Sequence, residues 1–89
     1  MYHFVLKKVY DGNYEEEMYV SNKYISFKEC YKSALSRFRN MREYAINYTH
    51  VIEFYKHDYK WHAERYVGIM QLNKLGDIWL CHKGTAINL

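Results

Sequence analysis

The chain has 89 residues, 49% of them hydrophobic, and a formal net charge of +3 at pH 7. This length and composition describe one folded domain with its own core, and they exclude a disordered tail. No apolar run approaches the roughly 18 residues of a transmembrane helix, and the opening MYHFVLKK places its charges after its apolar residues, the reverse of a signal peptide. Two cysteines are too few for a disulfide framework, so we expect reduced thiols and a cytoplasmic protein.

A β-hairpin is predicted at the start of the chain. Its two strands, residues 2–10 and 14–20, are rich in β-branched and aromatic side chains. Asp11-Gly12-Asn13 lies between them, and the Asp-Gly pair supplies the positive φ angles that a tight hairpin turn requires. We therefore expect two antiparallel neighbours in one sheet.

A helix is predicted over residues 27–45. Ser26 and Glu29 match a capping box, with serine at the N-cap and glutamate three residues later, and Ile25 and Cys30 stand at the positions of a hydrophobic staple. Apolar residues then recur within an arc of about 100°, the width of a stripe that faces a core. This stripe consists of Phe27, Cys30, Tyr31, Ala34, Phe38, Met41 and Ala45, with Leu35 at its edge.

The remainder of the chain is predicted to form three strands and a short tail. The strands cover residues 49–56, 61–72 and 77–83, and the tail covers 84–89. Gly68, inside the second of these strands, indicates a β-bulge or a close approach by an aromatic neighbour. The element order is β-β-α-β-β-β, so we expect a single α+β domain over residues 1–89, with one amphipathic helix packed on one face of an antiparallel sheet.

One helix covers only one face of such a sheet, and strand side chains alternate between the faces. We assign an apolar set to the helix face: Phe4, Leu6, Met18, Val20, Ile52, Phe54, Val67, Ile69, Ile78 and Leu80. The opposite face then carries Tyr19, Tyr55, Tyr66 and Trp79 among Lys7, Lys83, Glu15, Glu17, Glu53 and Glu64. The four aromatic residues predict a recognition surface for a protein partner or a second copy of the chain. The alternative is that they serve only strand propensity on a solvated face.

The charge is concentrated on the predicted helix. Residues 27–45 hold five basic and two acidic side chains, so the whole net charge of +3 lies there, and the rest of the chain is balanced. The basic residues are Lys28, Lys32, Arg37, Arg39 and Arg42. Such a face predicts nucleic-acid binding by phosphate contacts as an alternative function, while a solvated helix face is the non-functional alternative.

Histidines and cysteines give no motif for catalysis or metal binding. His57 and His62 flank a strand connection with Asp58 nearby, but this spacing matches no zinc pattern. Cys81 and His82 are adjacent in a strand, so their side chains point to opposite faces and do not pair as thiolate and base. The other cysteine lies on the apolar stripe of the helix, where we expect a small core residue.

A small metal-free ribonuclease of the toxin type is the remaining enzymatic alternative. Its acid–base groups would come from Lys56, Glu53, His62, Glu64 and Arg65. Glu64 and Arg65 alternate to opposite faces of a strand, which divides this set. We therefore expect no catalytic residues, no metal and no cofactor.

The function predicted from the sequence is non-catalytic binding, by docking on a protein partner or by self-association. A membrane partner is not expected. Lysine, asparagine, tyrosine, isoleucine and phenylalanine are abundant, and their codons are A/T-rich. This composition fits a phage or mobile-element accessory protein, for example an inhibitor of a host defence complex.

Overall fold

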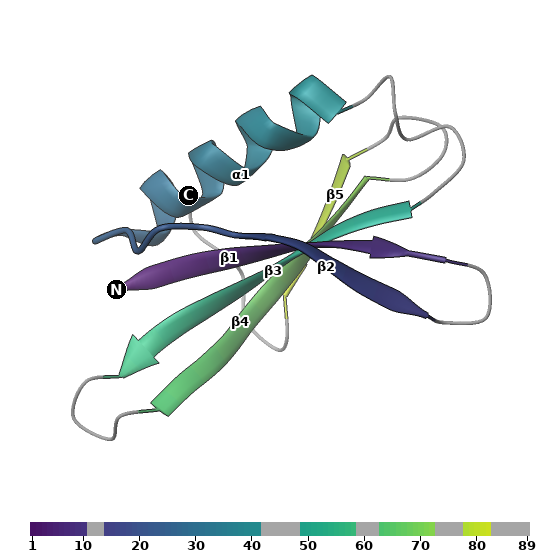
Figure 1. The fold of residues 1–89 in the computed structure, drawn as a ribbon. Coiled ribbons are helices and arrows are strands. Elements are labelled where there is room, and N and C mark those ends of the chain that lie inside the picture. Colours follow the sequence, from purple (N-terminus) through teal and green to yellow (C-terminus); the bar gives the residue numbers. More distant parts are fainter. Residues whose placement is uncertain (11–13, 42–48, 59–62, 73–77, 83–89) are drawn as a thin grey trace.

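The fold is one antiparallel sheet with one helix on a single face (Figure 1). The computed structural model describes residues 1–10, 14–41, 49–58, 63–72 and 78–82, and within them the side chains of all but residues 58, 63 and 78–82. The elements are β1 (Tyr2–Val9), β2 (Glu15–Val20), α1 (Phe27–Met41), β3 (Thr49–Asp58), β4 (Ala63–Leu72) and β5 (Ile78–His82). The strand order is β2-β1-β3-β4-β5, with every neighbouring pair antiparallel, so the predicted α+β class and element order are confirmed.

The start of α1 follows the predicted cap. The Ser26 Oγ accepts a hydrogen bond from the Glu29 backbone N–H at 3.2 Å, and the Ser26 carbonyl accepts from the Cys30 N–H at 3.2 Å. The predicted staple is wrong, because Ile25 is 80% exposed whereas Cys30 is buried. The described helix ends at Met41, and the predicted continuation to residue 45 lies outside the described residues, as do the turns at 11–13 and 73–76.

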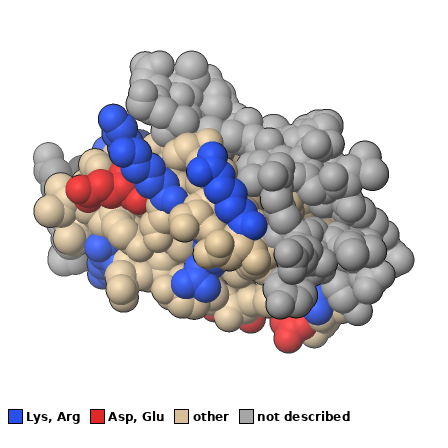
Figure 2. Space-filling model, turned by 90° about the horizontal axis from the view of Figure 1, so that it is seen from above, with Lys and Arg blue, Asp and Glu red and all other residues tan. Residues whose placement is uncertain are grey.

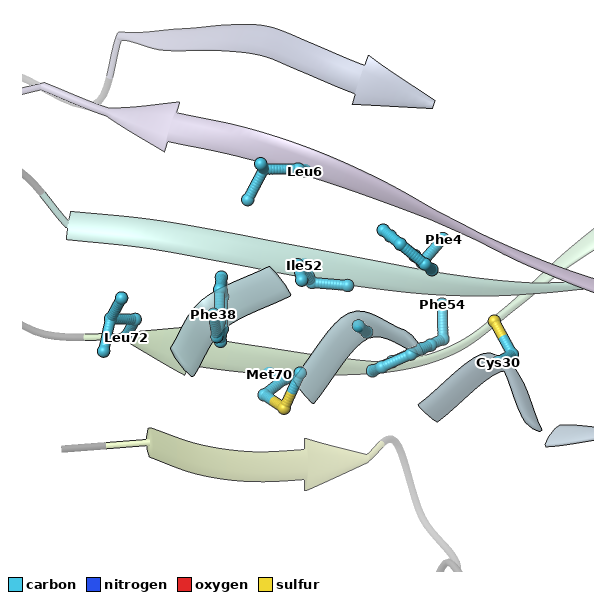
Figure 3. Packing of buried hydrophobic residues seen from close by; sticks show 9 residues of the cluster. Phe4, Leu6, Cys30, Phe38, Ile52, Phe54, Met70 and Leu72 are labelled. Carbon is cyan, nitrogen blue, oxygen red and sulfur yellow. The ribbon is translucent and has the colours of Figure 1, made fainter. Parts of the chain in front are cut away.

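The core lies between α1 and the sheet (Figure 3). Each buried member of this cluster is at most 2% exposed: Phe4, Leu6, Cys30, Ala34, Phe38, Ile52, Phe54, Met70 and Leu72. Phe54 joins the two layers, since its ring centroid lies 5.1 Å from that of Phe27 on the helix and 6.5 Å from that of Phe4 on β1. The predicted apolar stripe of the helix is therefore the face that is buried. Within the described residues, no helix has the length and apolar character to cross a membrane.

The facing of β4 differs from the prediction because of a bulge. Phe54 pairs with Gly68, but Tyr55 pairs with Tyr66, which leaves Val67 as an extra residue between them. The alternation shifts by one there, so Met70 and Leu72 lie under the helix, and Ile69 lies on the opposite face. The assignment of Ile69 to the helix face was wrong, whereas the bulge expected beside Gly68 is confirmed.

The facing of β2 is reversed only at its end, at Tyr19 and Val20. Leu6 pairs with Tyr19, so Tyr19 lies on the helix side, where it packs against the core. Met18 and Val20, which the pattern assigned to that side, are 47% and 50% exposed. The register between β1 and β2 shifts between Leu6 and Lys7. Beyond this shift Lys7 pairs with Glu17, so the glutamates of β2 follow a different alternation from Tyr19.

Candidate functional site

Two of the four predicted aromatic residues, Tyr55 and Tyr66, have described side chains on the far face, which we define as the sheet face turned away from α1. Tyr55 and Tyr66 pair across β3 and β4, with ring centroids 6.0 Å apart in an edge-to-face arrangement. The Tyr55 hydroxyl donates to Glu53 Oε1 at 3.4 Å, and burial is the main cause that raises its pKa. Tyr66 is 37% exposed, and Tyr55 is half-buried.

Of the other two predicted members, Tyr19 does not belong to this surface, and the side chain of Trp79 is not described. Tyr19 lies on the helix side, with its ring centroid 5.9 Å from that of Phe4. The Arg37 guanidinium carbon lies 3.6 Å from the centre of the Tyr19 ring, a cation–π contact that ties β2 to α1. Trp79 pairs with Gln71 in the β4–β5 register, and its side chain lies outside the described residues.

Ion pairs and buried side chains leave little open apolar surface on the described part of the far face. Lys7 forms an ion pair with Glu53, and its Nζ lies 3.4 Å from Glu15 Oε2. The hydrogen bond to Glu53 is the largest cause that raises the Lys7 pKa, and burial acts against it. Val5 and Val51, on the same face, are each only 7% exposed. The far face is therefore a poor hydrophobic docking surface over its described residues.

A cluster of two histidines and a glutamate lies at one end of the far face. His3 Nδ1 and His57 Nε2 are hydrogen-bonded at 2.8 Å, and Glu64 Oε1 lies 3.9 Å from His57 Nε2. Burial is the main cause that lowers the pKa of His3, and the charge of Glu64 opposes this shift. The sequence pattern suggested only an approach of His57 to His62 with Asp58 nearby, which matched no zinc pattern. The side chains of Asp58 and His62 lie outside the described residues.

Sequence reasoning missed His3 because it lies 54 residues from His57. The two histidines meet only because β1 pairs with β3, with His3 opposite Tyr55. The sequence gives no local signal for that pairing. A strand order placing β1 beside β3 would have been sufficient to find the cluster.

The basic residues of α1 divide between two sides of the helix. Lys28, Lys32 and Arg39 are exposed, and Figure 2 shows lysine and arginine side chains standing next to one another on the helix side of the molecule. A groove of about 530 Å³ follows them; its described lining is Lys28, Tyr31, Lys32, Leu35, Ser36, Arg39 and Asn40. Arg37 lies instead over the Tyr19 ring, and Arg42 is outside the described residues.

Within the part of the chain that the structure describes, the carboxylates and the thiol considered for catalysis are not brought together, although Lys56 and Arg65 lie opposite each other on β3 and β4. Cys30 is fully buried, and burial raises the pKa of its thiol to about 12, so it does not supply a thiolate. The Glu53 carboxylate forms an ion pair with Lys7. Glu64 pairs with His57, four residues along β3 from Glu53, which separates the two carboxylates by about 13 Å along the strand.

Comparisons with known proteins add no family to this geometry. The chain matches no family model, no curated protein and no solved structure. The groove along α1 and the histidine cluster are therefore interpreted from their own contacts and charges.

Proposed function

We propose that this protein is a non-catalytic binding protein that holds an acidic segment of a partner protein in the groove along α1. The observation that carries the proposal is the composition of this groove. Exposed Lys28, Lys32 and Arg39 lie in the same groove as the half-buried side chains of Tyr31 and Leu35. This combination supplies both charge attraction and apolar contact within one described surface.

The spacing of the cations suits an extended peptide. Lys28 and Arg39 are eleven residues apart, or about 16 Å along the helix axis. A peptide of about five extended residues covers that length. Lys32 lies between them on the same side of the helix, and the Arg39 guanidinium binds a carboxylate by two parallel hydrogen bonds when the geometry permits.

The apolar part of the groove favours a protein over a phosphate backbone. Tyr31 and Leu35 lie on the border of the core cluster, partly buried and partly open to the groove. A leucine or aromatic side chain of a peptide would cover this area and release water, at about 25 cal/mol per Å² of apolar surface. A phosphate backbone gains nothing comparable there, since its contacts are with charges and hydrogen-bond donors.

The direct test is binding of a fluorescently labelled acidic peptide containing glutamate and leucine, followed by anisotropy. Arg39→Glu should weaken binding by about tenfold or more, because a charge-assisted hydrogen bond contributes about 1.5–3 kcal/mol. The matched control is Arg65→Glu on β4, which makes the same charge change at another exposed position. Equal losses in the two variants, or no loss in either, would contradict binding in this groove.

Nucleic-acid binding through the same cations is the second candidate function, and the alignment of Lys28, Lys32 and Arg39 along one groove favours it. The two candidates differ at Leu35. Leu35→Ser should weaken binding of the peptide and leave binding of a labelled single-stranded RNA unchanged, because phosphate contacts do not use the apolar side chain. If the protein binds RNA tightly whether or not Leu35 is replaced, and does not bind the peptide, the function is nucleic-acid binding and the peptide proposal is wrong.

The setting we propose is the cytoplasm, where the buried, free thiol of Cys30 stays reduced. Action by docking alone agrees with the composition-based hypothesis of a phage accessory protein that inhibits a host defence complex. Such an inhibitor needs a binding surface but no catalytic groups. The burial of the Cys30 thiol and the separation of Glu53 from Glu64 agree with this mode of action.

A further inference from the structure

Three potential metal ligands converge at the end of the far face. They belong to His3, His57 and Glu64, and one ligand atom of each lies within 4.8 Å of the other two. In a four-coordinate zinc site with bonds of about 2.0–2.2 Å, neighbouring ligand atoms are about 3.4 Å apart. The observed separations of 2.8 Å and 3.9 Å lie on either side of that value, so small side-chain rotations are sufficient to admit an ion.

The sheet holds these ligands in place. The three residues come from β1, β3 and β4, and His57 is directly opposite Glu64 in the register. The His3 ring stacks on Tyr55, with centroids 5.2 Å apart and an angle of 14° between the planes. The His57 backbone N–H donates to the Met1 carbonyl at 2.7 Å, which fixes the neighbouring chain. Ligands on paired strands need little reorganisation when an ion binds.

We propose that His3, His57 and Glu64 form a binding site for a divalent transition-metal ion of the zinc class, with a fourth position open to water or an external ligand. Two imidazole nitrogens and one carboxylate oxygen suit zinc and its neighbours, whereas calcium and magnesium take oxygen ligands. Glu64 is 58% exposed at its side chain, so an ion has access from solvent.

The hydrogen bond between the two imidazoles already presents a lone pair to the site. Of His3 Nδ1 and His57 Nε2, 2.8 Å apart, one carries the proton and the other accepts it. The proton that joins the two imidazoles moves, on ion binding, to the other nitrogen of its own ring. Each ring then offers one lone pair to the ion, and the Glu64 carboxylate oxygen is the third ligand.

Such an ion would link strands that are distant in the sequence. It would connect β1 to β3 and β4 at their common end, and it would bind only the folded chain. The expected consequence is therefore a more stable protein at increasing zinc concentration. The site is separate from the groove along α1, because its ligands lie on the far face of the sheet.

The test uses purified protein without a polyhistidine tag, titrated with ZnCl₂ after treatment with a chelator. Calorimetry should show one ion per chain, and thermal unfolding should shift upward by several degrees with excess zinc and remain unchanged with MgCl₂. Glu64→Gln, at an exposed position that leaves folding intact, should weaken zinc binding by at least about tenfold. Glu17→Gln on β2, an exposed carboxylate elsewhere on the far face, is the matched control and should bind as the wild type does.

A second variant and a spectroscopic probe complete the test. His57→Ala should abolish stoichiometric binding, and Co²⁺ in place of zinc should give the intense visible absorption of a four-coordinate site in the wild type alone. If zinc does not bind stoichiometrically, the histidines form only a hydrogen bond and the proposal is wrong. Equal zinc affinity in Glu64→Gln and the wild type would overturn it as well.

Discussion

At the scale of single residues, His50 is a buried polar group with an unpaired ring nitrogen within the described residues. It is 2% exposed, and its Nδ1 has no hydrogen-bond partner among the residues that the structure describes. Burial lowers the pKa of this imidazole, and the charge of Lys8 lowers it further. The folded protein therefore disfavours the charged form of a residue that protonates readily, near pH 6.5, once the chain is unfolded.

This shift has a defined effect on the pH dependence of stability. Between the lowered pKa in the folded state and the ordinary value near 6.5, the unfolded chain binds more protons. The free energy of unfolding should thus fall as the pH decreases below about 6.5. His50→Leu removes this titrating group and should reduce the slope, and the similarly lowered pKa of His3 accounts for part of what remains. Urea denaturation at a series of pH values, with a chelator present, measures it; an identical slope in the variant would exclude His50 as the cause.

At the scale of elements, α1 depends on its first hydrogen bond. Ser26 Oγ accepts from the Glu29 N–H, one of the four amide groups at a helix start that have no partner within the helix. Ser26→Ala should lower the free energy of unfolding by about 1 kcal/mol. Ser36→Ala, at an exposed position within the same helix, is the matched control and should change stability by less than about 0.5 kcal/mol. Equal effects would show that the cap contributes nothing specific.

The elements also show how much of the fold the sequence determines locally. The cap at Ser26 and the stripe through Phe38 involve residues a few positions apart, and both were predictable. The sides of the strands were predictable only as far as the alternation continued. It is interrupted at Met18 of β2, opposite Leu6 and Lys7, and again at Val67 of β4, opposite Phe54 and Tyr55. Both interruptions depend on pairing between strands. Beyond them, an alternating pattern assigns residues to the wrong face.

The candidate site was less accessible to sequence reasoning for the same reason. Lys28, Lys32 and Arg39 share a helix face, so their grouping follows from helical spacing alone. Tyr19 was placed with the far-face tyrosines, but its pairing with Leu6 turns it to the helix side, under Arg37. The histidine cluster required the strand order, which no pattern within a single element contains.

At the scale of the whole molecule, one residue links the two layers on which both candidate sites depend. Phe54 is fully buried in the central strand β3, and its ring lies 5.1 Å from Phe27 and 6.3 Å from Tyr31 on α1, measured between centroids. A domain of 89 residues is stable by only about 5–13 kcal/mol. Phe54→Ala removes about 3–5 kcal/mol, a large part of that total, because the remaining cavity is enclosed by both layers.

Phe54→Ala should therefore weaken both peptide binding in the groove on α1 and zinc binding at the histidine cluster. Tyr66→Ala, at a residue 37% exposed on the far face, should lower the free energy of unfolding by less. Urea denaturation of both variants measures the difference. The groove needs α1 seated on the sheet, and the zinc site needs β1, β3 and β4 in register, so their common requirement is the core between them. Zinc should then partly restore the stability of Phe54→Ala, since an ion that binds only the folded chain shifts the folding equilibrium by mass action.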